Sequence, residues 1–367
     1  MKIGVLTSSR ADIGIYEPIL HYWKKLNLDF ELIVFGPNIV EHEDKYRLYI
    51  ENSGFKICEF IPLKMNGDGP MDVSRNFGET VSIFSEFWRT KHFDWVLSLG
   101  DRSEMAAAVV STVPFGINVA HLHAGECTEG SIDEIYRHQI TLVSKLQFVS
   151  HSINAKRVSQ LLNGHSNVFI VGAIGINTIK SEKFTSLEVL KMRWGINFTR
   201  PFLLMTIHPE TRNNKVNKNN AFELDKAIKI ILKKYDILAT GTNLDLGNKV
   251  FKNLISKNNS EYSSFQLIEN LGRKDYFSFL NSCSLVIGNS SSGIIESASF
   301  QKYNINIGAR QRGRLSSKNT IHVNFNCEEI VNAVEKFINK KYQGKNIYFK
   351  PEGLELLTQK LLTTYAQ

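Results

Sequence analysis

The sequence contains little cysteine and no long apolar run. Its four cysteines in 367 residues, Cys58, Cys127, Cys283 and Cys327, lie far apart and form no C-x-x-C pair. This spacing argues against a zinc site or a disulfide framework and fits reduced thiols in the cytoplasm. No stretch of about 18 apolar residues is present, as a transmembrane helix would require. The first residues, MKIGVLTSSRADIG, lack the long apolar segment of a secretory signal peptide, so we expect a cytoplasmic protein without a membrane partner.

Two motifs of cofactor and metal enzymes are also missing. The first apolar run leads into TSSRADIG and not into G-x-G-x-x-G, so a redox dinucleotide is not indicated. His121 and His123 alternate with Leu122 and could in principle chelate a metal, but H-E-x-x-H and its relatives are absent. We therefore expect neither a metal nor a cofactor.

The charge balance is basic. There are 44 Lys+Arg and 36 Asp+Glu residues, which give a formal net charge of +8. This excess fits an anionic partner, and by itself it leaves nucleic acid, a nucleotide and an acidic lipid open. With 43% hydrophobic residues, the chain is large enough for two domains with sizeable cores.

Short apolar runs alternate with helix-length amphipathic segments, and this pattern predicts parallel, doubly wound α/β sheets. In the first half, the predicted strands are 2–7, 30–35, 56–61, 95–100, 118–123, 146–150 and 168–172. After residue 200, they are 201–207, 237–241, 265–269, 285–289, 305–308 and 321–325. Helices are predicted between most of them, the first over 15–26.

We expect two domains, residues 1–180 and 181–350. The hinge is predicted in the charged segment 180–200, and a final helix, 351–367, is predicted to pack back toward the N-terminal domain. In doubly wound sheets the ligand lies beyond the carboxyl ends of the strands. The residues at those ends are therefore the candidates for function.

In the first half, two strand ends carry charged residues. Arg10 lies where a helix N-terminus would begin, and a cation there would hold an anion such as a phosphate. Asp101 and Arg102 follow the strand 95–100. Asp101 is either a helix N-cap or a functional carboxylate at the ligand-binding edge.

The segment HLHAGECTEGSIDEIYRH, residues 121–138, is dense in histidine and carboxylate side chains. On its predicted helix, Asp133 and Arg137 are four residues apart, as are Glu134 and His138, so two surface ion pairs are one interpretation. Acid/base chemistry is the other, with Glu126 and Asp133 near Asp101.

Three polar strand ends follow in the second half. His208 lies directly after the strand 201–207, in position for general acid/base work. The segment TGTNLDLG, 240–247, either hydrogen-bonds a base or ribose, with Asn243 as the candidate, or merely turns the chain. GNSSSGIIE, 288–296, predicts a diphosphate cradle at a helix N-terminus, with Glu296 one turn further on. The basic loop GARQRGR, 308–314, fits neutralisation of a nucleotide diphosphate better than nucleic-acid binding.

The ordered set SRADIG, GDRSE, HLHAGE-CTEGSIDE-IYRH, HPET, GNSSSGIIE and NIGARQRGR resembles a known family. This family is the hydrolysing UDP-N-acetylglucosamine 2-epimerases of sialic-acid biosynthesis. The set equally resembles their relatives acting on UDP-N,N'-diacetylbacillosamine in legionaminic-acid biosynthesis. The resemblance extends to about residue 325 and implies a GT-B fold of two Rossmann-like domains, with the active site in the cleft between them.

The resemblance also implies roles for individual residues. By position, Asp101, Asp133 and His208 match the family's catalytic residues, and Glu126 and His123 are further catalytic candidates. The substrate-binding candidates are Arg10, Arg102, Arg137, His138, Asn243, Ser290, Ser291, Gly293, Glu296, Arg310 and Arg314. Some family members carry a second glutamate where this chain has His123.

The implied reaction is elimination of UDP to a 2-acetamidoglycal, followed by addition of water. The reaction needs no cofactor. The resemblance implies a UDP-sugar as the substrate and a homodimer or homotetramer as the oligomeric state of the protein. Other interpretations are a non-hydrolysing epimerase, a GT-B glycosyltransferase and a nucleic-acid-binding protein. The non-hydrolysing branch usually carries His-Val-Glu-Ala-Gly followed by Leu-Arg, which this chain lacks.

Overall fold

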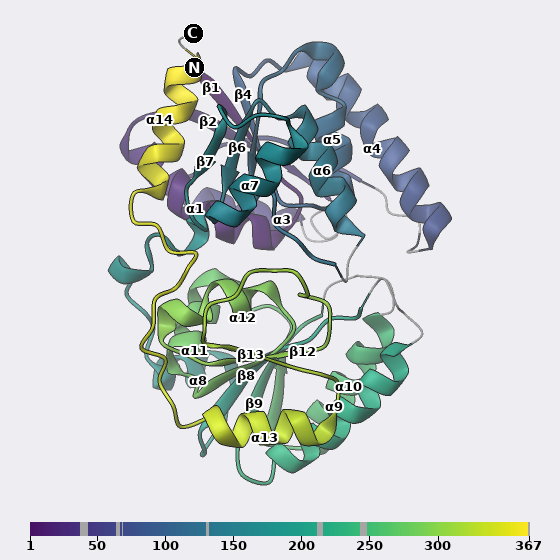
Figure 1. The fold of residues 1–367 in the computed structure, drawn as a ribbon, viewed down its shortest axis with the longest axis vertical. Helices are drawn as coiled ribbons and strands as arrows, with labels where there is room; N and C mark the ends of the chain where they lie inside the picture. Colours follow the sequence, from purple (N-terminus) through teal and green to yellow (C-terminus); the bar gives the residue numbers. More distant parts are fainter. Residues whose placement is uncertain are drawn as a thin grey trace. The chain divides into compact units, whose positions relative to one another are not determined.

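The computed structural model describes residues 1–36, 43–63, 67, 69–129, 132–210, 216–242 and 248–365, without the side chains of Arg10 and Lys45. The chain forms two compact units (Figure 1). The first unit contains Met1–Glu126, Asp133–Thr178 and Tyr348–Gln367. The second unit contains Cys127–Ile132 and Ile179–Ile347. The short segment that follows Glu126 therefore belongs to the second unit.

The first unit is built on a parallel sheet with the strand order β3-β2-β1-β4-β5-β6-β7. The strands are β1 (Lys2–Thr7), β2 (Asp29–Phe35), β3 (Ile57–Ile61), β4 (Trp95–Leu99), β5 (Val119–Leu122), β6 (Leu146–Val149) and β7 (Val168–Ile170). The strands β4, β5 and β6 are buried over their whole length because helices cover both faces of the sheet. Ile3 and Val5 contribute to the core on one face, and Leu6 contributes to the core on the other.

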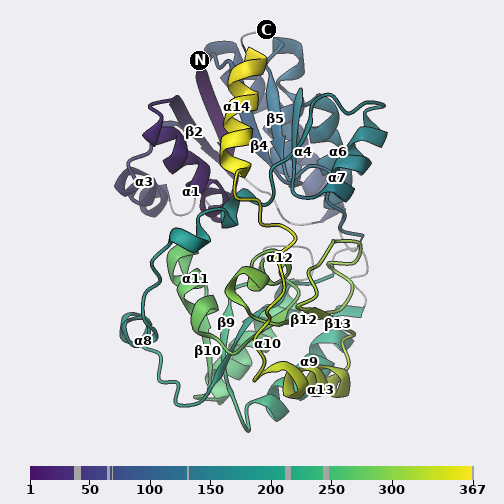
Figure 2. The ribbon, with the colours of Figure 1, turned by 60° about the vertical axis from the view of Figure 1, so that its left-hand side comes forward.

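Helices cover both faces of this sheet. They are α1 (Arg10–Lys25), α3 (Glu43–Asn52), α4 (Pro70–Thr90), α5 (Ser103–Val110), α6 (Asp133–Val143), α7 (Ser152–Leu161) and α14 (Gly353–Tyr365). The last helix, yellow in Figures 1 and 2, belongs to the first unit although it ends the chain. Trp23 on α1 donates a hydrogen bond of 2.8 Å from Nε1 to the Thr358 hydroxyl on α14. Leu357 joins Trp23 in the same buried core.

The second unit is also built on a parallel sheet, with the strand order β10-β9-β8-β11-β12-β13. The strands are β8 (Phe202–Thr206), β9 (Asp236–Thr240), β10 (Phe265–Ile268), β11 (Leu285–Gly288), β12 (Asn304–Ile307) and β13 (Thr320–Val323). The helices are α8 (Leu187–Trp194), α9 (Asn217–Ile231), α10 (Asn248–Glu261), α11 (Gly272–Ser282), α12 (Ser291–Ile295) and α13 (Cys327–Phe337). Leu203, Ile287 and Ile305 form part of its core.

The predicted α/β class and the predicted strands are confirmed, each strand within two residues at either end. The predicted start of the first helix at residue 15 is wrong, because α1 begins at Arg10. Ser9 caps this helix: its hydroxyl accepts from the Asp12 N–H, and the Asp12 carboxylate accepts from the Ser9 N–H. Such a capping box fixes a helix start in advance of its apolar stripe. The segment 180–200 contains a regular helix, α8.

Candidate active site

Three polar residues of the first unit follow neighbouring parallel strands. Asp101 follows β4, His123 follows β5 and Ser150 follows β6, and these strands are adjacent in the sheet. The carboxyl ends of parallel strands meet at one edge of a sheet, so the three residues lie at the same edge. The strand order reverses at β1 and β4, and ligands bind beside such a reversal in doubly wound sheets.

His123 and Glu126 form a buried pair in the turn after β5. His123 Nδ1 lies 2.6 Å from Glu126 Oε1, and the Glu126 side chain is 3% exposed. The Ser150 hydroxyl donates to the same Glu126 oxygen at 3.0 Å. The backbone of His123 has φ +61°, a left-handed conformation that is uncommon outside glycine and concentrates at functional sites. The turn is therefore built to hold this imidazole against this carboxylate.

Arg137 on α6 connects this turn to Asp101. Its guanidinium forms an ion pair with the Asp101 carboxylate and donates to the Glu126 carbonyl oxygen at 2.6 Å. Arg137 is 1% exposed, so the interpretation as a surface residue is wrong. Because Asp101 binds Arg137, it is also not the N-cap of α5, whose N-cap position is Arg102. A buried arginine thus fixes the orientation of Asp101 and the path of the Glu126 backbone.

The other helix pair predicted in this segment is absent. Within the described part of the chain, no ion pair joins Glu134 to His138, and His138 is exposed on α6. Asp133 is the half-buried first residue of α6. Its carboxylate is near the positive end of the helix, which favours a negative charge.

His121 is a structural residue. It is fully buried on β5, and its Nε2 donates to the Gly100 carbonyl oxygen at 2.8 Å. Its Nδ1 lies 3.2 Å from the Thr141 hydroxyl. Burial lowers the pKa of His121 to about 3 from its ordinary 6.5. The imidazole therefore stays neutral in the folded protein.

This burial predicts an acid-sensitive fold. Between pH 6.5 and 3 the unfolded chain binds a proton at His121 that the folded protein does not, so stability falls as the pH falls. From pH 7 to pH 5 the free energy of unfolding should decrease by about 2 kcal/mol through this group. His121→Asn should remove that part of the pH dependence in urea denaturation, and His92→Asn, at an exposed position, should not. Equal slopes in all three proteins would contradict this account of His121.

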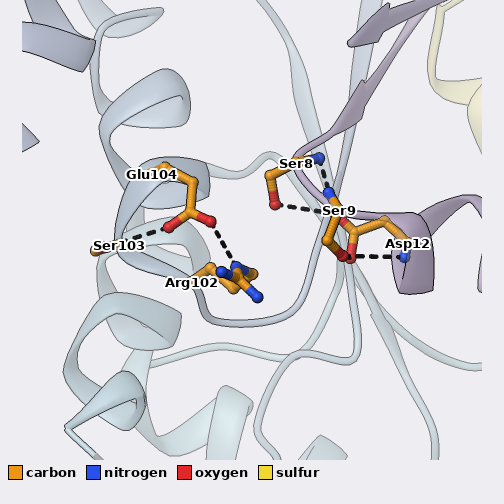
Figure 3. A network of polar contacts seen from close by, with 6 residues as sticks. All are labelled: Ser8, Ser9, Asp12, Arg102, Ser103 and Glu104. Carbon is orange, nitrogen blue, oxygen red and sulfur yellow. Dashed lines mark hydrogen bonds and ion pairs between the residues drawn. The ribbon is translucent and has the colours of Figure 1, made fainter. Parts of the chain in front are cut away.

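A second polar network surrounds the ends of β1 and β4 (Figure 3). Asp12 Oδ2 accepts from the Ser8 N–H at 2.8 Å and from the Ser8 hydroxyl at 2.9 Å. Burial raises the pKa of Asp12, against the opposing effect of the Arg102 charge. Arg102 Nε donates to the buried Glu104 at 2.5 Å. Arg102 thus lies just after β4, at the carboxyl edge of the sheet, and the side chain of Arg10 lies outside the described part of the structure.

In the second unit, His208 lies at the corresponding strand reversal. β8 and β11 are adjacent, and His208 and Asn289 follow their ends. The His208 N–H donates to Asn289 Oδ1 at 2.7 Å, and Asn289 Nδ2 donates to the His208 carbonyl oxygen at 2.9 Å. The sequence did not single out Asn289. Its fully buried amide fixes the backbone of His208, which is itself 5% exposed.

The turn from β11 into α12 is tight. Ser290 is the N-cap of α12, and its hydroxyl accepts from the Ser292 N–H at 3.4 Å. Ser291 is the first residue of this short helix. A Cβ at Gly293 would lie 2.5 Å from Asn304 Oδ1, so only glycine lets the helix approach β12 this closely.

Glu296 is oriented by two hydroxyls. Ser292 Oγ donates to Glu296 Oε2, and Tyr276 OH lies 2.5 Å from Ser292 Oγ. Tyr276 is a second residue that the sequence did not single out. Its pKa is raised by burial and by the nearby Glu296 charge, so the phenol remains a protonated donor.

The basic loop after β12 contacts the same turn. Arg310 NH1 and Gln311 Nε2 donate to the Asn289 carbonyl oxygen at 3.4 Å and 3.0 Å. Arg312 is exposed, and its carbonyl oxygen accepts from the Glu129 N–H at 3.0 Å. Arg314 is half-buried. The segment 127–129 therefore joins the second unit through this loop, while the predicted Asn243 lies outside the described residues.

Neither a cluster of metal-ligating side chains nor a membrane-spanning helix occurs among the described residues. No group of three or more His, Cys, Asp or Glu residues in the described part of the chain could hold a metal ion. None of the described helices is both long and apolar enough to span a bilayer.

Comparison with known proteins gives full-length matches. The family model described as UDP-N-acetylglucosamine 2-epimerase matches residues 23–361. A polysialic acid biosynthesis protein P7 of Escherichia coli is 30% identical over 96% of this chain and 91% of its own. A GDP/UDP-N,N'-diacetylbacillosamine 2-epimerase (hydrolyzing) of Campylobacter jejuni is 32% identical over 93% of this chain and 88% of its own.

A solved structure has the same fold. The UDP-GlcNAc 2-epimerase of Neisseria meningitidis bound to UDP-GlcNAc has a TM-score of 0.82 and 14% identity. The match covers 99% of this chain and 100% of the other. This likeness confirms the expected GT-B class of two parallel α/β units.

Proposed function

The chain belongs to the UDP-N-acetylglucosamine 2-epimerase family, and we propose that it is a hydrolysing member. It converts UDP-N-acetylglucosamine and water to N-acetylmannosamine and UDP, in the synthesis of a sialic-type acid. The observation that carries the proposal is the pair of strand-end clusters, one rich in proton-transferring groups and one rich in hydroxyls and cations. The hydrolysing class rests on the Campylobacter jejuni relative.

The reaction requires proton transfer on two faces of the sugar. A base removes the C2 proton, the electron pair forms a C1=C2 double bond, and the C1–O bond to UDP breaks. Water then adds at C1, and a proton returns to the other face of C2. We assign these transfers to groups among Asp101, Glu126, Asp133, His123 and His208. Such groups each contribute about 10²- to 10⁴-fold in rate.

The second unit provides the groups suited to UDP. Ser290, Ser291 and the N–H groups of the β11–α12 turn bind the diphosphate, with Arg310 and Arg314 supplying positive charge. Gly293 lets the backbone come close, and Glu296 accepts hydrogen bonds from ribose hydroxyls. In the first unit, Arg10, Arg102 and His138 are the proposed substrate-binding residues, with Asn243 in the second. Arg137, also expected to bind substrate, is buried and instead orients Asp101.

Tyr276→Phe tests the ribose assignment. The variant removes the donor to Ser292 and leaves Glu296 less well oriented. We expect the KM for the UDP-sugar to rise on the order of tenfold with little change in kcat, as one buried hydrogen bond is lost. Phe277→Tyr, at a buried neighbour that faces the Phe300 ring, serves as a control for disturbance of α11. An unchanged KM in Tyr276→Phe would contradict the assignment.

One other sugar is supported by a specific observation. The Campylobacter jejuni relative is named for N,N'-diacetylbacillosamine, so UDP-N,N'-diacetylbacillosamine is the second candidate substrate. Incubation with each UDP-sugar separately, with UDP release followed enzymatically, discriminates the two. Release of UDP without an acceptor also separates a hydrolysing epimerase from a glycosyltransferase. No release from either sugar would overturn the proposal.

The remaining proposals concern the protein's surroundings. We expect a homodimer or homotetramer, which light scattering of the purified protein would decide. We also place it in the cytoplasm, because the wide spacing of its four cysteines in the sequence fits reduced thiols.

A further inference from the structure

We propose that Nε2 of His123 is the atom that removes the C2 proton, and that Glu126, Ser150 and Asn154 position it. The reaction step in this inference rests on the proposed function. The direction of the hydrogen bonds among these residues rests on the geometry of the first unit alone. His123 is then the catalytic residue of this turn. Glu126 acts through it, in the way a buried carboxylate orients the imidazole of a hydrolase triad.

The direction of each hydrogen bond in the relay is fixed by chemistry. The Asn154 amide Nδ2 can only donate, and it lies 2.9 Å from Ser150 Oγ. The single hydroxyl proton of Ser150 is then donated to Glu126 Oε1 at 3.0 Å. A carboxylate that accepts from Ser150 also accepts from His123, 2.6 Å away. The proton of neutral His123 therefore lies on Nδ1, and Nε2 carries the lone pair.

The other nitrogen of His123 is available for chemistry. Nε2 is buried and has no hydrogen-bond partner among the described residues. Buried polar atoms are nearly always paired, so an unpaired basic nitrogen in a side chain 11% exposed points to a ligand. The left-handed backbone of His123 is the second indication of a constrained site.

Gly125 makes the relay possible. It has φ +70°, and a Cβ there would lie 2.5 Å from the Asn154 carbonyl oxygen on α7. Only glycine lets the turn after β5 close against α7 in this way. This approach places Glu126 beside Ser150, which comes just before α7.

The step balances without another reactant. The Nε2 lone pair takes the C2 proton, the C2–H electron pair becomes the C1=C2 double bond, and the C1–O bond breaks with release of UDP. His123 becomes an imidazolium beside the Glu126 carboxylate, which stabilises its charge. The proton is released to solvent before the next turnover.

The tautomer of His123 is measurable, and His121 provides the control. His121, two residues earlier on β5, donates from Nε2 to the Gly100 carbonyl and should show the opposite tautomer. Two-bond ¹⁵N–¹H correlation spectra of protein labelled with ¹⁵N-histidine should show His123 with its proton on Nδ1. His123→Asn, which suits a left-handed backbone, assigns the signal. A proton on Nε2 of His123 would overturn the relay, whatever substrate the protein uses.

Kinetics test the reaction step. His123→Asn should lower kcat about 10²- to 10⁴-fold and leave UDP binding unchanged by calorimetry. Ser150→Ala should lower kcat on the order of tenfold with KM unchanged, and should reduce the Nδ1–H population of His123. The controls His92→Asn, at an exposed histidine, and Ser98→Ala, at a buried serine that donates to Ala120 on β5, should change neither.

Two failures are distinguishable. If the unaltered protein releases no UDP from any UDP-sugar, the proposed function fails, and the His123 tautomer still decides the relay. If UDP is released and His123→Asn keeps full kcat, the proposed function stands and His123 is not the base.

Discussion

Asp101→Asn is expected to lower the rate of UDP release by about 10²- to 10⁴-fold, while the Kd for UDP stays within about twofold. Asp101 lies at the carboxyl edge of the sheet in the first unit, between the ends of β1 and β5 in the strand order, and is oriented by the buried Arg137. The amide keeps an oxygen that accepts from Arg137, and loses the ability to accept or deliver a proton at neutral pH. Initial rates and calorimetric titration with UDP separate the two effects.

Asp94→Asn is the matched control. Asp94 precedes β4, the strand that Asp101 follows, and its carboxylate accepts from the Lys2 N–H at 2.6 Å. It lies at the opposite end of the strand from the ligand edge. Its variant should therefore retain activity with a small loss of stability. Full turnover in Asp101→Asn, with circular dichroism unchanged, would remove Asp101 from the mechanism.

Gly288→Ala is expected to destabilise the second unit by about 3 kcal/mol or more and to abolish UDP binding. Gly288 ends β11 with φ +132°, and a Cβ would overlap the Thr206 carbonyl oxygen. That oxygen also accepts from the Asn289 N–H at 3.0 Å, so the chain cannot move away without breaking the bond that starts the turn. Urea denaturation and UDP calorimetry measure the two effects.

Gly100→Ala separates the cost of backbone strain from the cost of steric overlap at a new Cβ. Gly100 ends the comparable strand β4 of the first unit with φ +74°, and no atom lies within 4 Å of its Cβ position. Only the backbone conformation is penalised there, so we expect a loss of about 1–2 kcal/mol. Equal losses in the two variants would show that contact with Thr206 is not what requires glycine at position 288.

The fold was predictable because each strand is a short apolar run with a polar or glycine end. Apolar runs such as WVLSL and LVIG are buried on both sides, as in any parallel sheet covered by helices. Strand ends then locate Asp101, His123 and His208 without knowledge of the register. The sheet order, in which β1 neighbours β4 and β8 neighbours β11, sets Asp101 at the same sheet edge as Ser8 and His208 next to Asn289.

The partners of these residues could not be predicted from sequence. Ser150 follows β6 and Asn154 lies on α7, and only the β5–β6 register brings them to Glu126. Tyr276 on α11 contacts Ser292 on α12, which lies 16 residues further along the chain, and only the fold brings the two hydroxyls together. Local spacing also misled: Arg137 suggested a surface pair with Asp133, whereas tertiary packing buries its guanidinium against Asp101.

The measurement that tests the central claim most directly is the reaction of the protein with its UDP-sugar in deuterated water. Elimination and rehydration predict stoichiometric UDP and a free sugar of inverted C2 configuration that carries one deuterium at C2. Mass spectrometry and proton NMR of the product give both quantities. Release of UDP with the original hydrogen retained at C2 would contradict the account, because no proton would then have left that carbon.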